Sequence, residues 1–517
     1  MNAPDTTTTT GPGDATPDTT TTTGPGDTTP DTTTTGPGVA RPDTTNTSAA
    51  GEPTDGLTST AAPGEPTRVS VGDELELEIE SLAFGGAGVG RCNGGYVVFV
   101  DGALPGDRVR ALVHKRKRSY AQARALEVVE PGPDRVAPVA DHPGAPWQVL
   151  SYARQLEIKH GQVREALERL GRLEGFELDP IVPAVEEWRY RNKLEYSFGR
   201  SPTGELVCGF HEPGSWERIQ HVEDCMLASE AGNAARRQVL EWCRAQRLTA
   251  FDRRSHEGLL RNLVIREGRR SGQIQIRLVT GPGELDTDAL ALAVECDGLL
   301  VTRTDAMAET TSGGETELVR GVAALDEQVG ELNLRVSAEA FFQTNTEMAE
   351  KLYEVVAARA GLRGWERVYD LFCGTGTIAL TLAPRAGQVF GLELIPEAIA
   401  DAIENAARNE IENVFFYAGD VRLAMRELVE RAGRPDLVVV DPPRAGLSAK
   451  VVRRIIESSP KRIIYVSCNP TTLAPNAAQL VEAGWTLQRV SPVDMFPQTP
   501  HIECVALFER GHVPPGP

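Results

Sequence analysis

Alternation of apolar and polar residues marks the first folded part of the chain. From residue 75, Leu, Leu and Ile alternate with Glu, and strand-like apolar runs follow at residues 96–100, 107–115 and 121–129. Alternation with a period of two is typical of strands that bury one face. A glycine-rich turn at residues 85–88 separates the first two runs. Residues 67–130 are therefore predicted to form a small OB-like barrel of about five strands.

The C-terminal part shows continuous apolar runs separated by helical patterns. After a predicted helix at residues 346–360, the strands are expected at residues 367–372, 388–392, 414–418, 437–440 and 462–466. Strands without alternation are buried on both faces, so residues 336–510 are predicted to form a Rossmann-like, doubly wound α/β domain.

Two further regions lack such a regular pattern. Residues 131–335 mix a helical stretch at 155–170 with strand-like runs at 194–198 and 273–279, which predicts a central domain of mixed α and β structure. Residues 1–66 repeat a Thr-rich unit ending in Gly-Pro-Gly and contain few apolar residues. We expect this tail to be disordered, serving as a linker or as a binding or solubility tail.

Composition restricts the class of protein. No run approaches the roughly 18 apolar residues of a membrane-spanning helix, and the chain starts without a basic stretch followed by an apolar one, so a cytoplasmic protein is expected. The eight cysteines are scattered and form no Cys-x-x-Cys pair. This spacing argues against a secreted disulfide scaffold and against a zinc ribbon.

The net charge of −20 is unfavourable for a nucleic-acid-binding protein, but the tail is acidic and the folded part has local basic stretches. His-Lys-Arg-Lys-Arg at residues 114–118 ends close to Tyr120, and Arg-Tyr-Arg-Asn-Lys occupies residues 189–193. Basic residues beside an aromatic suit RNA phosphates and bases. The alternatives are a solvated hairpin tip for the first stretch and a surface loop for the second.

Residues that follow predicted strands carry the candidate chemistry, because ligands of parallel sheets bind at the carboxyl ends of the strands. Asp-Leu-Phe-Cys-Gly-Thr-Gly-Thr occupies residues 370–377, and Glu393 follows the next strand. A glycine turn joined to this acid, without the third glycine of a dinucleotide site, favours S-adenosylmethionine over NAD. Cys373 lies within the glycine turn and is interpreted as structural.

Two later loops point to a carbon target. Residues 441–444 read Asp-Pro-Pro-Arg, where many amino-methyltransferases carry an aromatic residue in the place of Arg444. Carbon 5 of uracil is too weak a nucleophile unless a thiolate first adds to carbon 6 and a base later removes the carbon 5 proton. Cys468 and Glu503 are the candidates for these roles. Alone, such a cysteine is more often a buried apolar residue and such a glutamate a surface carboxylate.

These motifs resemble the RNA uracil-5-methyltransferase family, which contains the ribosomal RumA-type and the transfer-RNA TrmA-type enzymes. The resemblance runs from about residue 67 to 510 and also rests on Phe-Phe-Gln-Thr-Asn at 341–345 and on residues 494–503. It implies a TRAM domain for the barrel, Cys468 as nucleophile and Glu503 as base, with Asp441 near both the cofactor and the uracil. The residues that it implies for binding S-adenosyl-L-methionine are Gln343, Phe372, Thr377, Glu393, Asp420 and Asp441.

The sequence departs from this family at two places. Many RumA-type members carry a cysteine cluster after the TRAM domain, whereas residues 138–147 contain His142 and no cysteine, and Cys225 alone resembles a member of such a set. An iron–sulfur cluster needs about four thiolates, so no cluster is expected and no residue is assigned as a metal ligand, while replacement by another metal centre stays open. Pro475 replaces a residue that is basic in relatives, which leaves the start of the predicted helix around it open.

The expected function is methylation of carbon 5 of a uracil in structured RNA by a monomer. Ribosomal RNA, 23S in particular, is favoured because TRAM modules accompany ribosomal enzymes more often, and transfer RNA is the alternative. Two other classes stay open: an RNA-binding protein with a vestigial methyltransferase domain, and an enzyme that methylates a base nitrogen or a protein without using Cys468.

Overall fold

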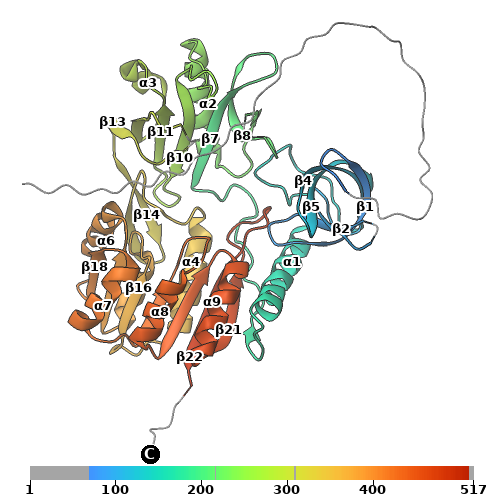
Figure 1. Ribbon diagram of the computed structural model, residues 1–517. Helices are drawn as coiled ribbons and strands as arrows, with labels where there is room; N and C mark the ends of the chain where they lie inside the picture. Colours follow the sequence, from blue (N-terminus) through green and yellow to red (C-terminus); the bar gives the residue numbers. More distant parts are fainter. Residues whose placement is uncertain (1–68, 93, 216, 308–309, 512–517) are drawn as a thin grey trace, which may run out of the picture. The chain divides into compact units, whose positions relative to one another are not determined.

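A computed structural model describes residues 69–92, 94–215, 217–307 and 310–511 (Figure 1). The predicted disordered tail, residues 1–66, lies outside the described residues. The described chain contains a closed barrel, a seven-stranded sheet, a two-stranded hairpin and an eight-stranded sheet. Both the barrel and the doubly wound sheet expected from the sequence are thereby confirmed.

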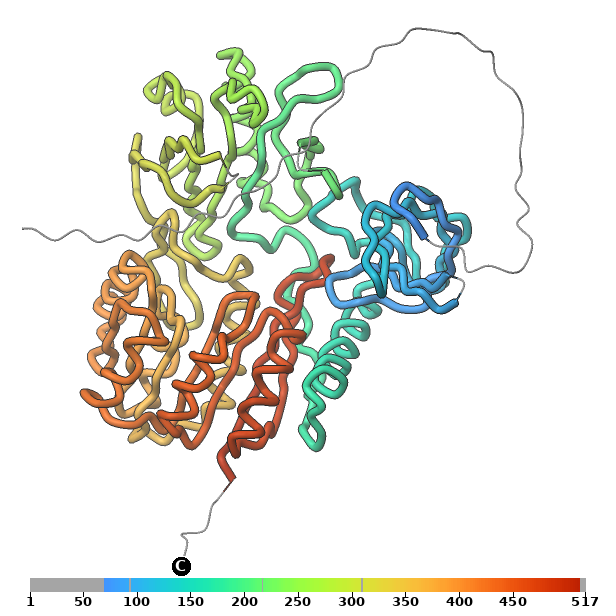
Figure 2. The backbone as a smooth tube through the Cα atoms, viewed as in Figure 1, coloured from blue at the N-terminus to red at the C-terminus, as the bar shows by residue number. Residues whose placement is uncertain are grey.

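The barrel is built from five strands in the order β1-β2-β3-β5-β4. Their bounds are β1 (Glu74–Leu82), β2 (Gly88–Arg91), β3 (Val97–Asp101), β4 (Arg108–Arg116) and β5 (Tyr120–Glu130). Alternate apolar residues point inward and form the core, among them Leu77, Ile79, Val98, Val100, Val109 and Ala123. The tube in Figure 2 shows how the strands wrap around this core, in blue.

The basic stretch of residues 114–118 lies at the exposed tip between β4 and β5. Tyr120 does not extend freely from this tip, because its ring packs edge-on against Phe99 with the centroids 5.5 Å apart. The tip therefore offers solvated cations beside an aromatic ring that the barrel holds in place.

The central sheet has the order β13-β12-β11-β10-β7-β8-β9, and only β11 and β12 run parallel among its neighbouring strands. Its strands are β7 (Lys193–Arg200), β8 (Leu206–His211), β9 (Ile219–His221), β10 (Leu260–Glu267), β11 (Ile274–Thr280), β12 (Gly298–Arg303) and β13 (Glu315–Gly321). Helices α2 (Glu230–Ala245) and α3 (Thr287–Ala293) share one core with this sheet.

The eight-stranded sheet has the order β18-β17-β16-β19-β20-β22-β21-β6. Its members are β6 (Glu177–Leu178), β16 (Arg367–Leu371), β17 (Gln388–Glu393), β18 (Val414–Ala418), β19 (Leu437–Val440), β20 (Arg462–Ser467), β21 (Trp485–Val493) and β22 (Glu503–Arg510). Strand β22 is antiparallel to both of its neighbours, whereas β16 to β20 run parallel.

Helices cover both faces of this sheet, as Figure 1 shows. Val438 and Val440 belong to the core on one face, which they share with α7 (Val421–Ala432), α8 (Ala449–Ser458) and α9 (Pro470–Glu482). Leu437 and Val439 belong to the other core, with α4 (Thr346–Ala360), α5 (Thr377–Leu382) and α6 (Pro396–Arg408). Burial of both faces explains why these strands lack polar alternation.

Neighbouring segments complete the domain. Helix α1 (Tyr152–Glu165) continues into the π-helical turn η1 (Ala166–Leu170), which corresponds to the helix expected at residues 155–170. The hairpin β14 (Ala324–Val329) and β15 (Leu332–Ser337) contributes apolar residues to the core that contains α4. Helix α9 begins at Pro470 and continues through Pro475, which settles the open start of this helix.

Residues 189–193 were expected to be either a basic patch with an aromatic for RNA or a surface loop, and neither expectation holds for the buried Tyr190 and Asn192. Tyr190 is fully buried and its hydroxyl donates to the carbonyl of Pro497 at 3.0 Å. Asn192 is also buried and donates to the carbonyl of Gln343 at 2.9 Å. These contacts join the central sheet to the C-terminal domain. Among the described residues, no helix combines the length and the apolarity needed to cross a bilayer.

Candidate active site

The glycine turn after β16 brings the backbone close to where a ligand would lie. Phe372 has φ 65°, a left-handed conformation that is unfavourable for a residue with a side chain, and its amide donates to the carbonyl of Leu392 at 2.8 Å. Gly376 has φ 84° and precedes α5, and a Cβ there would meet the ring of Phe416 at 2.7 Å. The turn therefore requires glycine, and its strain at Phe372 is typical of binding sites.

Asp370 places a carboxyl group beneath this turn. It is fully buried, and its Oδ2 accepts from the amide of Ala379 at 2.9 Å, while its Oδ1 has no partner among the described residues. Burial, together with the negative charge of Asp441, raises the pKa of Asp370 well above its usual range. A buried carboxyl with an unused acceptor fits a cationic ligand. The sequence motif includes this residue, but we had not predicted a role for it.

Glu393 at the end of β17 has an oriented carboxylate. Its Oε1 accepts from the amides of Leu394 at 2.7 Å and Ile395 at 3.1 Å, and its Oε2 accepts from the amide of Gly374 at 3.3 Å. A carboxylate offers about four acceptor positions, so capacity remains for the hydroxyls of a ribose.

Asp420 lies beside Glu393, because the amide of Gly419 donates to the carbonyl of Glu393 at 2.7 Å. Asp420 also caps α7 through the amide of Arg422 at 2.8 Å and forms an ion pair with the same arginine. The hydrogen bonds from Arg422 lower the pKa of Asp420, so this group is a charged acceptor at neutral pH.

Two other predicted cofactor residues are buried. The Thr377 hydroxyl donates to that of Tyr353 at 3.1 Å, which joins α5 to α4. Gln343 lies just before α4, and its carbonyl accepts from Asn192. Four of the predicted cofactor residues thus lie in or beside one glycine turn: Phe372, Thr377, Glu393 and Asp420. Gln343 lies on a separate segment, which leads into α4.

The pairing of β20 with β22 brings Cys468 and Glu503 together. Ser467 and Cys504 are direct partners in the antiparallel register, so Cys468, one residue beyond β20, lies across from Glu503 at the start of β22. Cys468 is partly exposed, whereas Glu503 is only 3% exposed. Asp441 follows β19, the neighbour of β20 on its other side. The thiol, the buried carboxyl group and a second acid therefore lie at the same end of three neighbouring strands.

Burial and negative charge dominate the electrostatics of this group. Burial, and then the charges of Glu503 and Asp441, raise the pKa of Cys468 to about 11, against a lowering by Arg444. Burial raises the pKa of Asp441 to about 7, although the residue keeps some exposure to solvent. Burial is also the largest cause of the raised pKa of Glu503, and the negative charge of Asp441 is the second. A nearby cation, such as a sulfonium, would favour the ionised forms of these three acidic groups.

The N-cap residue of α9 and two polar side chains of the helix hold the loop that carries Asp441. Asn469 donates to the carbonyl of Arg444 at 3.2 Å, and Thr472 donates to the same oxygen at 3.2 Å. Asn476 accepts from the amide of Leu447 at 2.9 Å. Gly446 is essential to this contact, because a Cβ there would meet Oδ1 of Asn476 at 2.9 Å. None of these positioning residues was singled out from the sequence.

A basic and aromatic rim lies next to Cys468. Arg444 donates to Nδ1 of His501 at 3.2 Å. Burial and then the charge of Arg444 lower the pKa of His501 to about 4, so the imidazole is neutral at pH 7. The ring of Phe496 lies edge-on to that of His501 and under the Arg191 guanidinium, 5.5 Å from its centroid. Flat surfaces of this kind suit a nucleobase.

The region where relatives carry a cysteine cluster has a different arrangement. Nε2 of His142 lies 3.1 Å from Sγ of Cys225, and both residues are buried. Burial lowers the pKa of His142 to about 4, so its imidazole is neutral at pH 7 and is hydrogen-bonded to the Cys225 sulfur. Within the described part of the chain, no three His, Cys, Asp or Glu side chains come together to hold a metal ion.

Comparison with known proteins identifies the family. The model of the family described as tRNA (Uracil-5-)-methyltransferase matches residues 315–511, and that of the TRAM domain matches residues 68–126. An uncharacterized RNA methyltransferase of Chlorobaculum tepidum is 36% identical over 471 residues, which cover 86% of this chain and 98% of the relative. One of Halalkalibacterium halodurans is 37% identical over 451 residues, covering 85% and 98%.

The chain belongs to the RNA uracil-5-methyltransferase family. Its structure resembles that of the Pyrococcus abyssi tRNA (uracil-54, C5)-methyltransferase in complex with S-adenosyl-L-homocysteine, with a TM-score of 0.68 and 26% identity over 84% of this chain and 100% of that one. The methyltransferase uses S-adenosyl-L-methionine, acts on RNA and carries a TRAM domain, as the sequence predicted.

Proposed function

We propose that this methyltransferase modifies carbon 5 of a uracil through covalent catalysis by Cys468 and Glu503. The observation that carries the proposal is the register of β20 and β22, which places the thiol across from the buried carboxyl group beside Asp441. A methyltransferase that acts on a nitrogen needs no thiol at this position. The intact glycine turn and the oriented carboxylate of Glu393 speak against a vestigial domain.

The reaction begins when the Cys468 thiolate adds to carbon 6 of the uracil, which moves the electron pair of the C5–C6 bond toward carbon 5 and oxygen 4. Carbon 5 then bonds to the methyl group, whose former electron pair stays on the departing sulfur. The Glu503 carboxylate takes the carbon 5 proton, the C5–C6 double bond re-forms, and the thiolate leaves. Asp441 lies close enough to affect both side chains and would orient the uracil.

We propose Gln343, Phe372, Thr377, Glu393, Asp420 and Asp441 as the cofactor-binding residues. S-adenosyl-L-methionine supplies the methyl group and a positive sulfonium. Glu393 would accept from the ribose hydroxyls, and the charged Asp420 would accept from the adenine amine. The unpaired Oδ1 of Asp370 adds a further acceptor beneath the turn.

Two substitutions test the mechanism. Cys468→Ala should abolish formation of 5-methyluridine while binding of S-adenosylhomocysteine, measured by calorimetry, stays within twofold. Cys92→Ala is the matched control, because Cys92 is also a partly exposed thiol but lies in the barrel, and it should keep full activity. Methylation by Cys468→Ala would refute the covalent mechanism.

Glu503→Gln provides an independent test of the base. Addition and methyl transfer can still proceed, but removal of the carbon 5 proton is blocked, so a protein–RNA adduct should accumulate and persist in denaturing gels. If this variant turns over normally without an adduct, Glu503 is not the base.

We propose 23S ribosomal RNA as the substrate, acted on by a monomer in the cytoplasm. Transfer RNA is the second candidate, favoured by the tRNA in the name of the matching family and of the Pyrococcus abyssi protein. Both RNA classes from a strain that lacks the gene should be incubated with the purified enzyme and analysed for 5-methyluridine. Methylation of transfer RNA alone would overturn the ribosomal assignment.

A further inference from the structure

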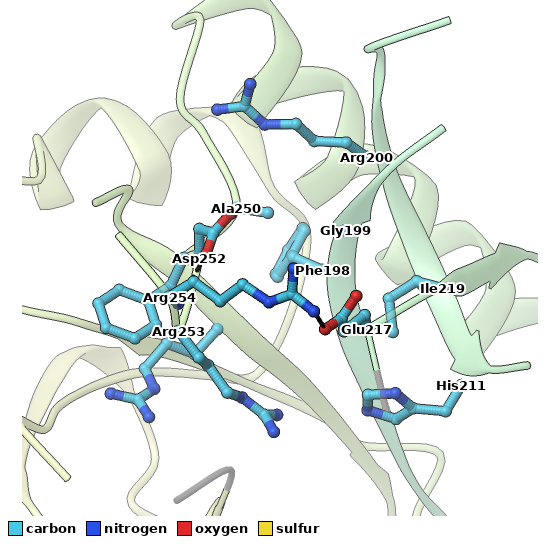
Figure 3. A pocket seen from close by; sticks show the side chains of 12 residues that line it. Phe198, Gly199, Arg200, His211, Glu217, Ile219, Ala250, Asp252, Arg253 and Arg254 are labelled. Carbon is cyan, nitrogen blue, oxygen red and sulfur yellow. Dashed lines mark hydrogen bonds and ion pairs between the residues drawn. The ribbon is translucent and has the colours of Figure 1, made fainter. Parts of the chain in front are cut away.

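A basic pocket lies in the central domain, formed by strands that the proposed chemistry does not use. Its cavity of about 240 Å³ is bounded by the ends of β7, β8, β9 and β10 and by the segment at residues 250–254 (Figure 3). The lining includes the arginines Arg200, Arg253, Arg254 and Arg261, together with His211. Phe198 and Phe251 provide apolar walls.

The positive charges in the pocket lie close to one another. Arg261 is only 5% exposed, and burial and then the charge of Arg253 lower its pKa. Arg253 also contributes to the lowered pKa of His211, after burial. Among the described residues, two carboxylates line the same cavity, Glu217 and Asp252, and the charge of Asp305 raises the pKa of Arg261. Since like charges in a concave site repel one another, an anion that enters the cavity relieves this repulsion.

The surrounding protein holds these arginines in place. The Arg261 guanidinium stacks on the ring of Phe251, 4.6 Å from its centroid, and donates to the carbonyl of Ala306 at 2.5 Å. Arg254 extends across the cavity to an ion pair with Glu217, as Figure 3 shows. Guanidinium groups fixed in this way are suited to phosphate oxygens, which they bind through two parallel N–H groups.

We propose that this pocket binds a backbone phosphate of the substrate RNA at a distance from the target uracil. The pocket matters for a chain of net charge −20, because RNA must be attracted locally against an unfavourable overall charge. This inference rests on the proposed function in one respect, that the substrate is RNA. It does not depend on Cys468 or Glu503.

Strand β7 connects the pocket to the C-terminal domain. Asn192, just before the strand, donates to Gln343 and to Thr346, both at 2.9 Å, whereas Arg200 at the other end lines the pocket. At about 3.3 Å per residue, the strand separates these ends by roughly 25 Å. The pocket would therefore hold nucleotides several positions away from the uracil, which adds affinity without reading the target base.

The test uses the full-length enzyme with unmethylated 23S ribosomal RNA and bulk transfer RNA from a strain that lacks the gene. The double variant Arg200→Gln/Arg253→Gln removes two positive charges, and Arg200→Glu makes the same change of two charge units at a single exposed position. Arg237→Gln is the control, because Arg237 is an exposed arginine of α2 in the same domain, outside the pocket. Thermal melting should show that all variants fold.

Filter binding over a range of salt concentrations should show about tenfold weaker RNA binding for the double variant. The slope of log affinity against log salt should decrease in magnitude by about one. At saturating RNA, kcat should stay within twofold while KM rises. Because binding is measured without turnover, absence of uracil methylation by the wild-type enzyme would refute the proposed function and leave this test intact.

Two results would overturn the proposal. One is that both pocket variants bind RNA within twofold of Arg237→Gln with an unchanged salt slope. The other is that the substitutions weaken binding of a free mononucleotide, 5′-AMP, but not of RNA, which would assign the pocket to a small ligand.

Discussion

The environment of Cys468 lowers the reactivity of its thiol in the free enzyme. With a pKa of about 11, against 9.0 for an ordinary cysteine, the thiolate at pH 8 falls from about 9% to about 0.1% of the population. The more basic thiolate is intrinsically more nucleophilic, which recovers roughly a factor of ten. We therefore expect alkylation of Cys468 by iodoacetamide at pH 8 to be roughly tenfold slower in the folded protein than in the unfolded chain.

A sulfonium near the carboxyl groups should reverse this effect. A unit charge at roughly 7 Å, with an effective dielectric constant of about 20, contributes about 2 kcal/mol, or between one and two pKa units. S-adenosylmethionine should accelerate alkylation of Cys468 several-fold at pH 8. S-adenosylhomocysteine has the same shape without the positive sulfur, so it separates the effect of charge from the effect of occupancy.

The assay follows the Cys468 peptide by mass spectrometry after timed alkylation between pH 7 and 11. The rate should rise about tenfold per pH unit up to pH 10, and Cys92 provides an internal reference. A rate that is flat over this range, or equal acceleration by both cofactor forms, would refute the electrostatic explanation.

Three further predictions concern stability and binding. Asp370→Asn should raise the melting temperature of the free enzyme at pH 8 by a few degrees. The pKa of Asp370 is raised in the folded state, so this acid destabilises the fold at any pH above its pKa in the unfolded chain. The same substitution should lower the affinity for S-adenosylmethionine, measured by calorimetry. Gly446→Val should cost about 1–3 kcal/mol in urea unfolding and reduce kcat, because φ there is +74° and a Cβ would meet Asn476. Asp107→Asn should destabilise the barrel at pH 7. Burial raises the pKa of Asp107, but hydrogen bonds from Arg135 and from two backbone amides outweigh burial, so the pKa is lowered overall. The stabilisation by Asp107 is therefore present above about pH 4 and disappears at lower pH. Unfolding of wild type and variant followed by circular dichroism should show this difference.

The C-terminal domain could be predicted well from sequence because its signals are local. The helix expected at residues 346–360 matches α4, which Asn345 caps at its start and Gly361, in a left-handed conformation, ends. Strands buried on both faces appear as apolar runs with clear limits, as in β19 and β20. The rule that ligands bind where such strands end drew attention to Glu393 and Cys468, whereas the full set of cofactor residues came from the resemblance to the family and stays a prediction.

Features that depend on distant contacts escaped prediction. Tyr190 appeared to belong to a surface loop because its partner, the carbonyl of Pro497, is more than 300 positions away in the chain. Asn476 looks like any polar residue of a helix until the loop of Asp441 lies against it. Two of the pocket arginines come together because β7 pairs with β10, with Ser197 beside Asn262, so that Arg200 and Arg261 line one cavity.

The reversed direction of β22 has a consequence for the order of events during turnover. Cys468 and Glu503, the proposed nucleophile and base, lie next to the last pair of one hydrogen-bonded ladder, Ser467 and Cys504. Separating them would therefore require breaking backbone hydrogen bonds of a buried sheet. We therefore expect the proposed catalytic pair to be assembled before RNA binds. The conformational change needed for reaction then takes place in the RNA, which must expose its uracil to the preformed site.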